Sequence, residues 1–102
     1  MGLIKKYLKS KGICKVTFKI TDKEANGAKT VAVLGDFNNW ETAATPMKSL
    51  KNGTFTATVD LDTNQEYHFR YLMDGERWEN DWEADNYAAS GYGDSENSVI
   101  IT

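Results

Sequence analysis

The sequence contains very little cysteine, proline or histidine: each occurs once among its 102 residues. The single cysteine, Cys14, cannot form an internal disulfide, and its place on the apolar side of an alternating segment predicts a buried, unreactive thiol. One histidine and one cysteine cannot supply the usual ligands of a zinc site, and no phosphate-binding glycine loop is present. We therefore expect no cofactor and no bound metal.

Long hydrophobic runs are missing as well. No segment approaches the roughly 18 apolar residues of a membrane-spanning helix. The lysine-rich beginning of the chain is not followed by the apolar stretch and small-residue cleavage site of a signal peptide. These features predict a cytoplasmic protein without a membrane partner.

Each part of the chain has little charge of one sign. Residues 1–34 carry eight lysines against Asp22 and Glu24, a balance of +6, whereas residues 35–102 carry four basic and thirteen acidic groups, a balance of −9. An acidic surface repels phosphate backbones, so the second half is not expected to bind nucleic acid.

Alternation of apolar and polar residues dominates the rest of the sequence. Glycine-containing turns such as Asn26-Gly27 and Asp74-Gly75 separate the alternating segments. Short strands between turns predict an all-β protein, an antiparallel sandwich formed as one domain by residues 13–102. The expected strands begin at Ile13, Thr30, Thr54, Tyr67 and Val99.

The first twelve residues form a basic leader in this interpretation. Ile4, Tyr7 and Leu8 are spaced as on one face of a helix, among lysines, which permits one or two helical turns. Such a short helix is marginal alone. The leader is expected either to pack loosely on the domain or to dock onto an acidic partner.

Three tryptophans, Trp40, Trp78 and Trp82, lie in polar surroundings. A loop tryptophan either folds back onto the core or serves as a platform for a ligand, and for Trp40 the neighbouring residues favour neither reading. Trp78 has the alternative role of capping the open end of the sandwich. For Trp82, covering the core or contacting a partner is favoured over binding sugar.

Flat aromatic rings edged by amides, carboxylates and a guanidinium complement a sugar ring, whose faces carry C–H groups and whose rim carries hydroxyls. Each stack is worth roughly 0.5–1.5 kcal/mol beyond its buried area, so a dissociation constant of about 10 µM to 1 mM is expected. As alternatives, Arg70 pairs with a carboxylate on a solvated face, and His68 faces solvent. The candidate edge residues are Asn38, Asn39, Arg70, Glu76 and Asn97.

Three segments of the chain form a recognisable combination: Gly35-Asp-Phe-Asn-Asn-Trp40, Tyr67-His-Phe-Arg-Tyr-Leu-Met-Asp-Gly75 with Trp78 after it, and Glu96-Asn-Ser-Val99. Together they resemble carbohydrate-binding module family 48, which includes the early-set domain of isoamylases and branching enzymes and the glycogen-binding domain of the AMP-activated protein kinase beta subunit. The resemblance implies an immunoglobulin-like sandwich that binds α-1,4-linked glucans such as glycogen, starch or maltooligosaccharides. It also implies that Trp40 and Trp78 grip glucose units, with Arg70 and Asn97 at their edge. This requires the two indoles to lie side by side and level enough to receive a sugar ring.

Two departures from the family pattern concern the same site. The chain has one more residue between the Asp74-Gly75 turn and Trp78, and Tyr92 stands in the region where the kinase-type domain has a leucine that threads the glucan. Since many early-set domains bind no sugar, a second hypothesis is a protein interaction module that docks a separately encoded glucan-processing enzyme. Nothing marks a pair of opposed carboxylates, so an enzyme is not expected.

Overall fold

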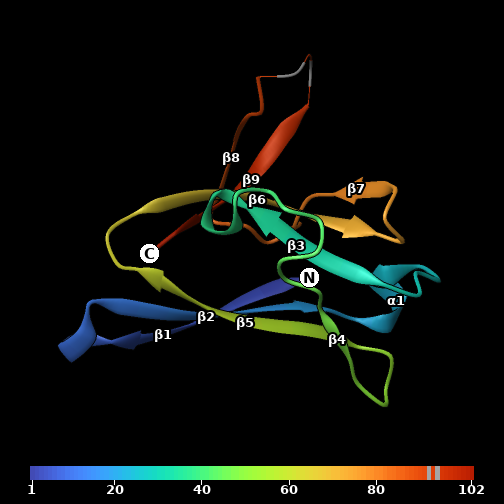
Figure 1. Ribbon diagram of the computed structural model, residues 1–102, viewed down its shortest axis with the longest axis horizontal. Helices are drawn as coiled ribbons and strands as arrows, with labels where there is room; N and C mark the ends of the chain where they lie inside the picture. The colour runs from blue at the N-terminus through green and yellow to red at the C-terminus, as the bar shows by residue number, and fades with distance from the viewer. Residues whose placement is uncertain (92, 94) are drawn as a thin grey trace.

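Two antiparallel β-sheets pack face to face in the computed structural model, which describes residues 1–91, 93 and 95–102 (Figure 1). The predicted all-β sandwich is confirmed. The first sheet has the strand order β1 (Gly2–Leu8), β2 (Ile13–Ile20), β5 (Phe55–Asp62), β4 (Lys48–Ser49). The second has the order β3 (Val31–Gly35), β6 (Glu66–Met73), β9 (Glu96–Ile101), β8 (Asn86–Ala89), and β7 (Arg77–Glu79) pairs with β6.

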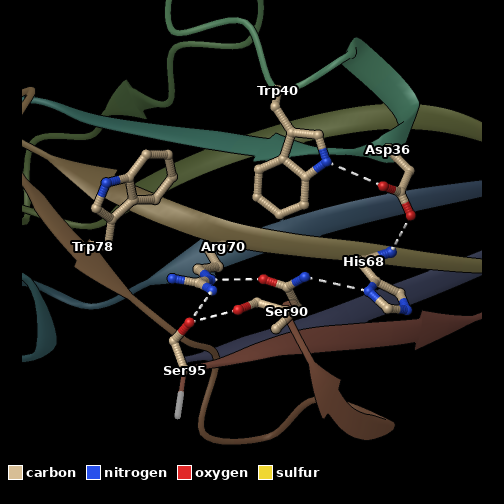
Figure 2. A pocket seen from close by; sticks show the side chains of 8 residues that line it. Asp36, Trp40, His68, Arg70, Trp78, Ser90 and Ser95 are labelled. Carbon is tan, nitrogen blue, oxygen red and sulfur yellow. Dashed lines mark hydrogen bonds between the residues drawn. The ribbon is translucent and has the colours of Figure 1, made fainter. Parts of the chain in front are cut away.

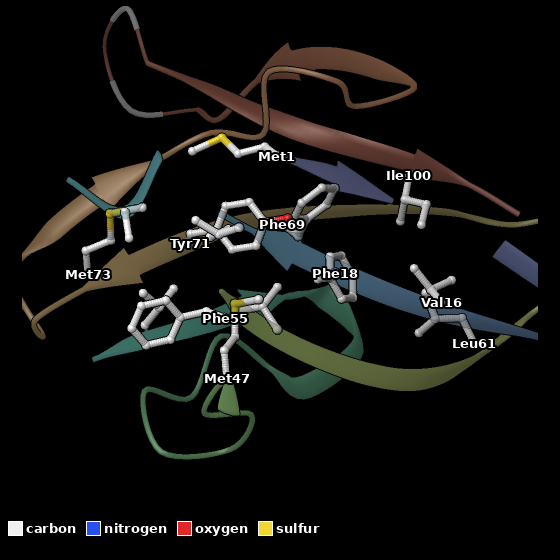
Figure 3. Close-up of a cluster of buried hydrophobic side chains, with 14 of the residues drawn as sticks. Met1, Val16, Phe18, Met47, Phe55, Leu61, Phe69, Tyr71, Met73 and Ile100 are labelled. Atoms are coloured by element: carbon white, nitrogen blue, oxygen red, sulfur yellow. The ribbon is translucent and has the colours of Figure 1, made fainter. Parts of the chain in front are cut away.

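The core lies between the sheets, where alternate residues of the long strands point inward (Figure 3). Phe18 of β2 packs edge-on against Phe69 and Tyr71 of β6, with ring centroids 5.1 and 6.3 Å away. Cys14 is fully buried on the same face of β2, as its place in the alternation predicted. Burial of each such side chain stabilises the fold by roughly 1.5–3 kcal/mol.

The expected helical leader is wrong: residues 2–8 form β1, which pairs antiparallel with β2 from Gly2 opposite Lys19 to Leu8 opposite Ile13. The edge of β2 offers a full row of hydrogen bonds, whereas a two-turn helix would be marginal. Lys5 Nζ donates to Asp85 Oδ2 at 2.6 Å and to the Ile101 carbonyl at 2.9 Å, which ties β1 to the second sheet.

Short helices connect some of the strands: η1 (Lys9–Lys11), α1 (Asp22–Ala25) and η2 (Asp36–Asn38). A capping box begins α1, since Thr21 Oγ1 accepts from the Glu24 amide and the Glu24 carboxylate accepts from the Thr21 amide. None of the helices in the described residues is long and apolar enough to cross a membrane.

One edge of β6 is shared by two partners, and this positions the site described below. Residues 66–69 of β6 pair with β9, whereas residues 71–73 pair with β7. Arg70 therefore lies at the junction between the two partners. Strands β7 and β8 fall in the polar stretch 76–98, where the sequence pattern indicated no strand before Val99.

Candidate functional site

The turn after β3 is built by the residues of the Gly35–Trp40 run. A Cβ atom on Gly35 would lie 2.5 Å from the His68 carbonyl oxygen, so only glycine lets β3 approach β6 this closely. Phe37 points inward and packs against Phe18, with ring centroids 5.7 Å apart. Asn38 closes the turn: its Oδ1 accepts from the Gly35 amide and its Nδ2 donates to the Val33 carbonyl, each at 3.0 Å. Asn38 is thus a structural residue.

The backbone conformation and a hydrogen bond of the indole set the orientation of the Trp40 side chain. Asn39 and Trp40 both have a φ of 57°, in the left-handed region that asparagine tolerates better than tryptophan. The Trp40 indole Nε1 donates to Asp36 Oδ1 at 3.0 Å, and the His68 backbone amide donates to Asp36 Oδ2 at 2.8 Å. The Asp36 carboxylate therefore holds the indole edge against β6.

Trp78 approaches the same place from β7, where it lies opposite Leu72 of β6. Its side chain is 45% exposed, so it does not cap the core. The Trp40 and Trp78 ring centroids are 6.5 Å apart and the ring planes meet at 56° (Figure 2). The two rings are neighbours, as expected, and they form an angled pair with no common plane.

A chain of hydrogen bonds runs beneath the two indoles (Figure 2). Arg70 Nε donates to Asn97 Oδ1 at 2.7 Å, and Arg70 Nη2 donates to Ser95 Oγ at 3.3 Å. Asn97 Nδ2 donates to His68 Nδ1 at 3.3 Å, which places the ring proton of a neutral His68 on Nε2. Arg70 and Asn97 thus hold each other in place.

Together these side chains surround an open cleft of about 660 Å³ on the outer face of the second sheet. In the described part of the chain, its lining combines two large aromatic rings with one guanidinium, one carboxylate and several other polar groups. The lining residues are Asp36, Trp40, His68, Arg70, Trp78, Ser90, Ser95 and Asn97.

Comparison with known proteins agrees with this architecture. Residues 15–88 match the family carbohydrate-binding module 48 (isoamylase N-terminal domain), which is more than half of the chain. The chain belongs to this family. No curated protein matches the chain. The family has an immunoglobulin-like fold, in agreement with the sandwich, and its members are carbohydrate-binding modules.

Of the residues that the family resemblance implicated, the structure brings Trp40, Trp78, Arg70 and Asn97 to one cleft. Asn39 and Glu76, also predicted at the site, are exposed and outside its lining. Asn39 is used as a left-handed turn residue, and Glu76 lies in the turn beyond the end of β6. Tyr92 lies outside the described residues.

Sequence reasoning missed four residues of the lining: Asp36, His68, Ser90 and Ser95. His68 lies on the outward face of β6, as expected, and shares this face with Arg70, so its place in the cleft could have been found from the alternation. Asp36 stands inside the Gly35–Trp40 run. The two serines carried no signal, because the β8–β9 connection is polar throughout.

A second polar cluster lies on the core side of β6. Asp81 is fully buried; its Oδ2 accepts from the Tyr71 hydroxyl at 2.6 Å and its Oδ1 accepts from the Glu83 amide at 2.7 Å. Burial, followed by the charge of Asp81 and its hydrogen bond, raises the pKa of Tyr71 well above its usual value. Within the described part of the chain, no group of three or more histidine, cysteine, aspartate and glutamate side chains is placed to hold a metal ion.

Proposed function

We propose that the protein is a non-catalytic module that binds α-1,4-linked glucans, with glucose units against Trp40 and Trp78. The observation that carries the proposal is the pair of indoles, 6.5 Å apart, on one open cleft. Exposed tryptophans are costly to leave in water and are frequent in binding sites. In a carbohydrate-binding family, the rings are best used as stacking surfaces for sugar.

The angle between the rings favours an α-linked chain. An α-1,4 linkage turns each glucose ring relative to the next, so the chain curves and its faces are not coplanar. Two indoles that meet at 56° suit successive or alternate units of such a curved chain. A straight β-1,4-linked chain would instead be matched by coplanar rings.

Arg70 and Asn97 supply the hydrogen bonds of the proposal. The Arg70 guanidinium uses its Nε and one Nη2 donor within the protein, which leaves further N–H groups for sugar hydroxyls. Because Asn97 is held by Arg70 and donates to His68, it needs little reordering when a ligand arrives. Weak binding is expected, with a dissociation constant of about 10 µM to 1 mM.

The cleft favours binding over hydrolysis. Among the described lining residues one, Asp36, is a carboxylate, and both of its oxygens already accept hydrogen bonds. Glycoside hydrolysis ordinarily needs two carboxylates flanking the scissile bond.

Titration with maltoheptaose, followed by tryptophan fluorescence, tests the proposal. We expect Trp40→Ala and Trp78→Ala each to weaken binding roughly tenfold, because each removes one stacking surface. Tyr7→Ala removes an exposed aromatic ring that lies outside the cleft and serves as the matched control. Equal affinities for all variants would contradict stacking on Trp40 and Trp78. No response to any glucan, together with a concentration-dependent mass, would favour the protein-docking alternative.

A further inference from the structure

A second hollow is lined by residues of α1 and β7. These two elements lie at the same end of the sandwich (Figure 1). Its volume is about 250 Å³. Arg77 and Glu79 of β7 contribute to it, whereas Trp78 between them lines the cleft described above. Alternation along β7 thus directs neighbouring side chains to two different hollows. The residues that line the second one are Met1, Lys23, Glu24, Asn26, Arg77, Glu79 and Trp82.

Trp82 is the aromatic surface of this hollow. Its side chain is 66% exposed, compared with 45% for Trp78. Trp82 therefore does not cover the core, whereas the other expected role, contact with a partner, stays a prediction. Its exposure in a hollow resembles the arrangement of the cleft, where the exposed Trp78 and the half-buried Trp40 stand next to polar groups.

The polar edge of the hollow repeats the chemistry of the cleft as well. Arg77 Nη2 donates to the Ala25 carbonyl at 3.1 Å and contacts Met73 Sδ at 3.2 Å, which fixes the guanidinium next to the hollow. The amide of Asn26, at the end of α1, adds donor and acceptor groups. A guanidinium and an amide beside a tryptophan correspond to Arg70 and Asn97 beside Trp78.

Charge of both signs lies around the hollow. Its lining residues carry two cationic side chains, Lys23 and Arg77, and two carboxylates, Glu24 and Glu79. The Glu24 carboxylate already accepts from the backbone amide and hydroxyl of Thr21, each at 2.9 Å, and from the Met1 ammonium group. A neutral, hydroxyl-rich ligand suits such a site better than an anion or a cation, because either would meet fixed charges of its own sign.

We propose that Trp82 and this hollow form a second α-glucan contact, so that one module holds two segments of the same polysaccharide. This inference rests on the proposed function of the cleft and extends it. Two weak sites on one rigid body act together on a large branched ligand, whereas a short oligosaccharide occupies each site separately. The module then binds glycogen more tightly than it binds maltotriose, because glycogen can occupy both sites at once.

Indole N–H resonances of the intact chain test the proposal directly, because the chain has three tryptophans and each gives one signal. The signals are assigned with single tryptophan-to-phenylalanine variants and followed during titration with maltotriose. We expect the Trp82 signal to shift along its own saturation curve, in addition to shifts of the Trp40 and Trp78 signals.

The outcomes separate the two proposals. A stationary Trp82 signal with moving Trp40 and Trp78 signals overturns the second contact and leaves the proposed function intact. Movement of Trp82 alone supports the hollow and overturns the cleft, and no movement overturns both. A stationary Trp82 signal together with a concentration-dependent mass that Trp82→Ala abolishes assigns the hollow to a second copy of the chain.

Glycogen retardation in native gels tests the joint action of the two sites. Trp82→Ala is expected to weaken glycogen binding about threefold to tenfold while the maltotriose affinity read from Trp40 stays unchanged. Trp82→Phe keeps a stacking ring and should retain most of the glycogen affinity. Equal retardation of wild type and Trp82→Ala overturns the joint action.

Discussion

Arg70 and Tyr71 are neighbours on β6, yet they belong to two hydrogen-bond networks with different properties. Tyr71 points into the core and donates to the buried Asp81, whereas Arg70 points outward and donates to Asn97 in the cleft. In the described residues no buried side-chain nitrogen or oxygen lacks a partner, so the core network is closed. The cleft network keeps donors for a ligand. We infer that the first network stabilises the fold and the second presents the site.

The largest expected effect is on the core network. Asp81→Ala removes the acceptor of the buried Tyr71 hydroxyl and of the partly buried Glu83 amide, and leaves the Tyr71 donor unsatisfied in the core. We expect a loss of about 3 kcal/mol of unfolding free energy, which corresponds to a melting temperature lower by roughly 10–20 °C. Thermal denaturation followed by circular dichroism measures it.

Glu83→Ala is the matched control for that experiment, because it removes an exposed carboxylate two residues along the same loop. Its effect should stay within about 0.5 kcal/mol. Maltoheptaose affinity of the folded protein should not change in either variant, since neither residue lines the cleft. A similar melting temperature for both variants would mean that the buried pair contributes little.

Alkaline pH is expected to weaken the same network. Burial and Asp81 raise the pKa of Tyr71 in the folded protein, whereas in the unfolded chain it is about 10. The stabilisation is fully present below about pH 10 and is lost as the pH rises further, by up to about 1.4 kcal/mol per pH unit, because only the unfolded chain releases the proton.

Urea denaturation at pH 8, 9.5 and 11, compared between wild type and Tyr71→Phe, isolates this contribution. Other tyrosines and lysines titrate in both proteins, so their effects cancel in the difference. The wild type should lose its advantage over Tyr71→Phe as the pH rises. A difference that is independent of pH would contradict the assigned network.

The core network also shows what the sequence could not predict. Asp81 lies among acidic residues, a composition typical of a solvent-exposed loop. It is nevertheless buried, because its side chain accepts a hydrogen bond from Tyr71, which is ten positions away in the sequence. In contrast, β2, β5 and β6 were predictable, because each buries one face and alternates accordingly. β1 was not, since Ile4, Tyr7 and Leu8 fit a helical period and the pairing with β2 decides the outcome.

Convergence of the cleft residues was predicted from the family resemblance and not from any local pattern. Trp40 follows β3, Trp78 is on β7, and Asn97 is on β9, and they meet because β6 pairs with all three strands. Such pairing between distant segments leaves no periodic signal. Glu76 has the right chemistry and lies two residues from Trp78, but the turn between β6 and β7 keeps it out of the cleft lining.

Substitution of Arg70 by lysine perturbs the cleft network and leaves the core network unchanged. Lysine keeps the charge but lacks the planar fork that bonds Asn97 and Ser95 together. We expect maltoheptaose binding to weaken roughly tenfold while the melting temperature changes by less than about 4 °C. Arg77→Lys is the control, with affinity read from the Trp40 indole signal, because Arg77 does not line the cleft. If Arg70→Lys and Arg77→Lys weakened maltoheptaose binding equally, the hydrogen bonds of Arg70 in the cleft would not be the cause.

The smallest effect is expected for Asp36, which we infer to be a positioning residue. Asparagine at this place keeps one acceptor oxygen, so it cannot accept from both the Trp40 indole and the His68 amide as the carboxylate does. A less firmly held indole should weaken maltoheptaose binding about threefold in Asp36→Asn, a loss of roughly 0.7 kcal/mol. Because this loss acts through Trp40, it should disappear in the Trp40→Ala background. An equal loss in both backgrounds would mean that Asp36 affects the ligand without the indole, by its charge or through β6.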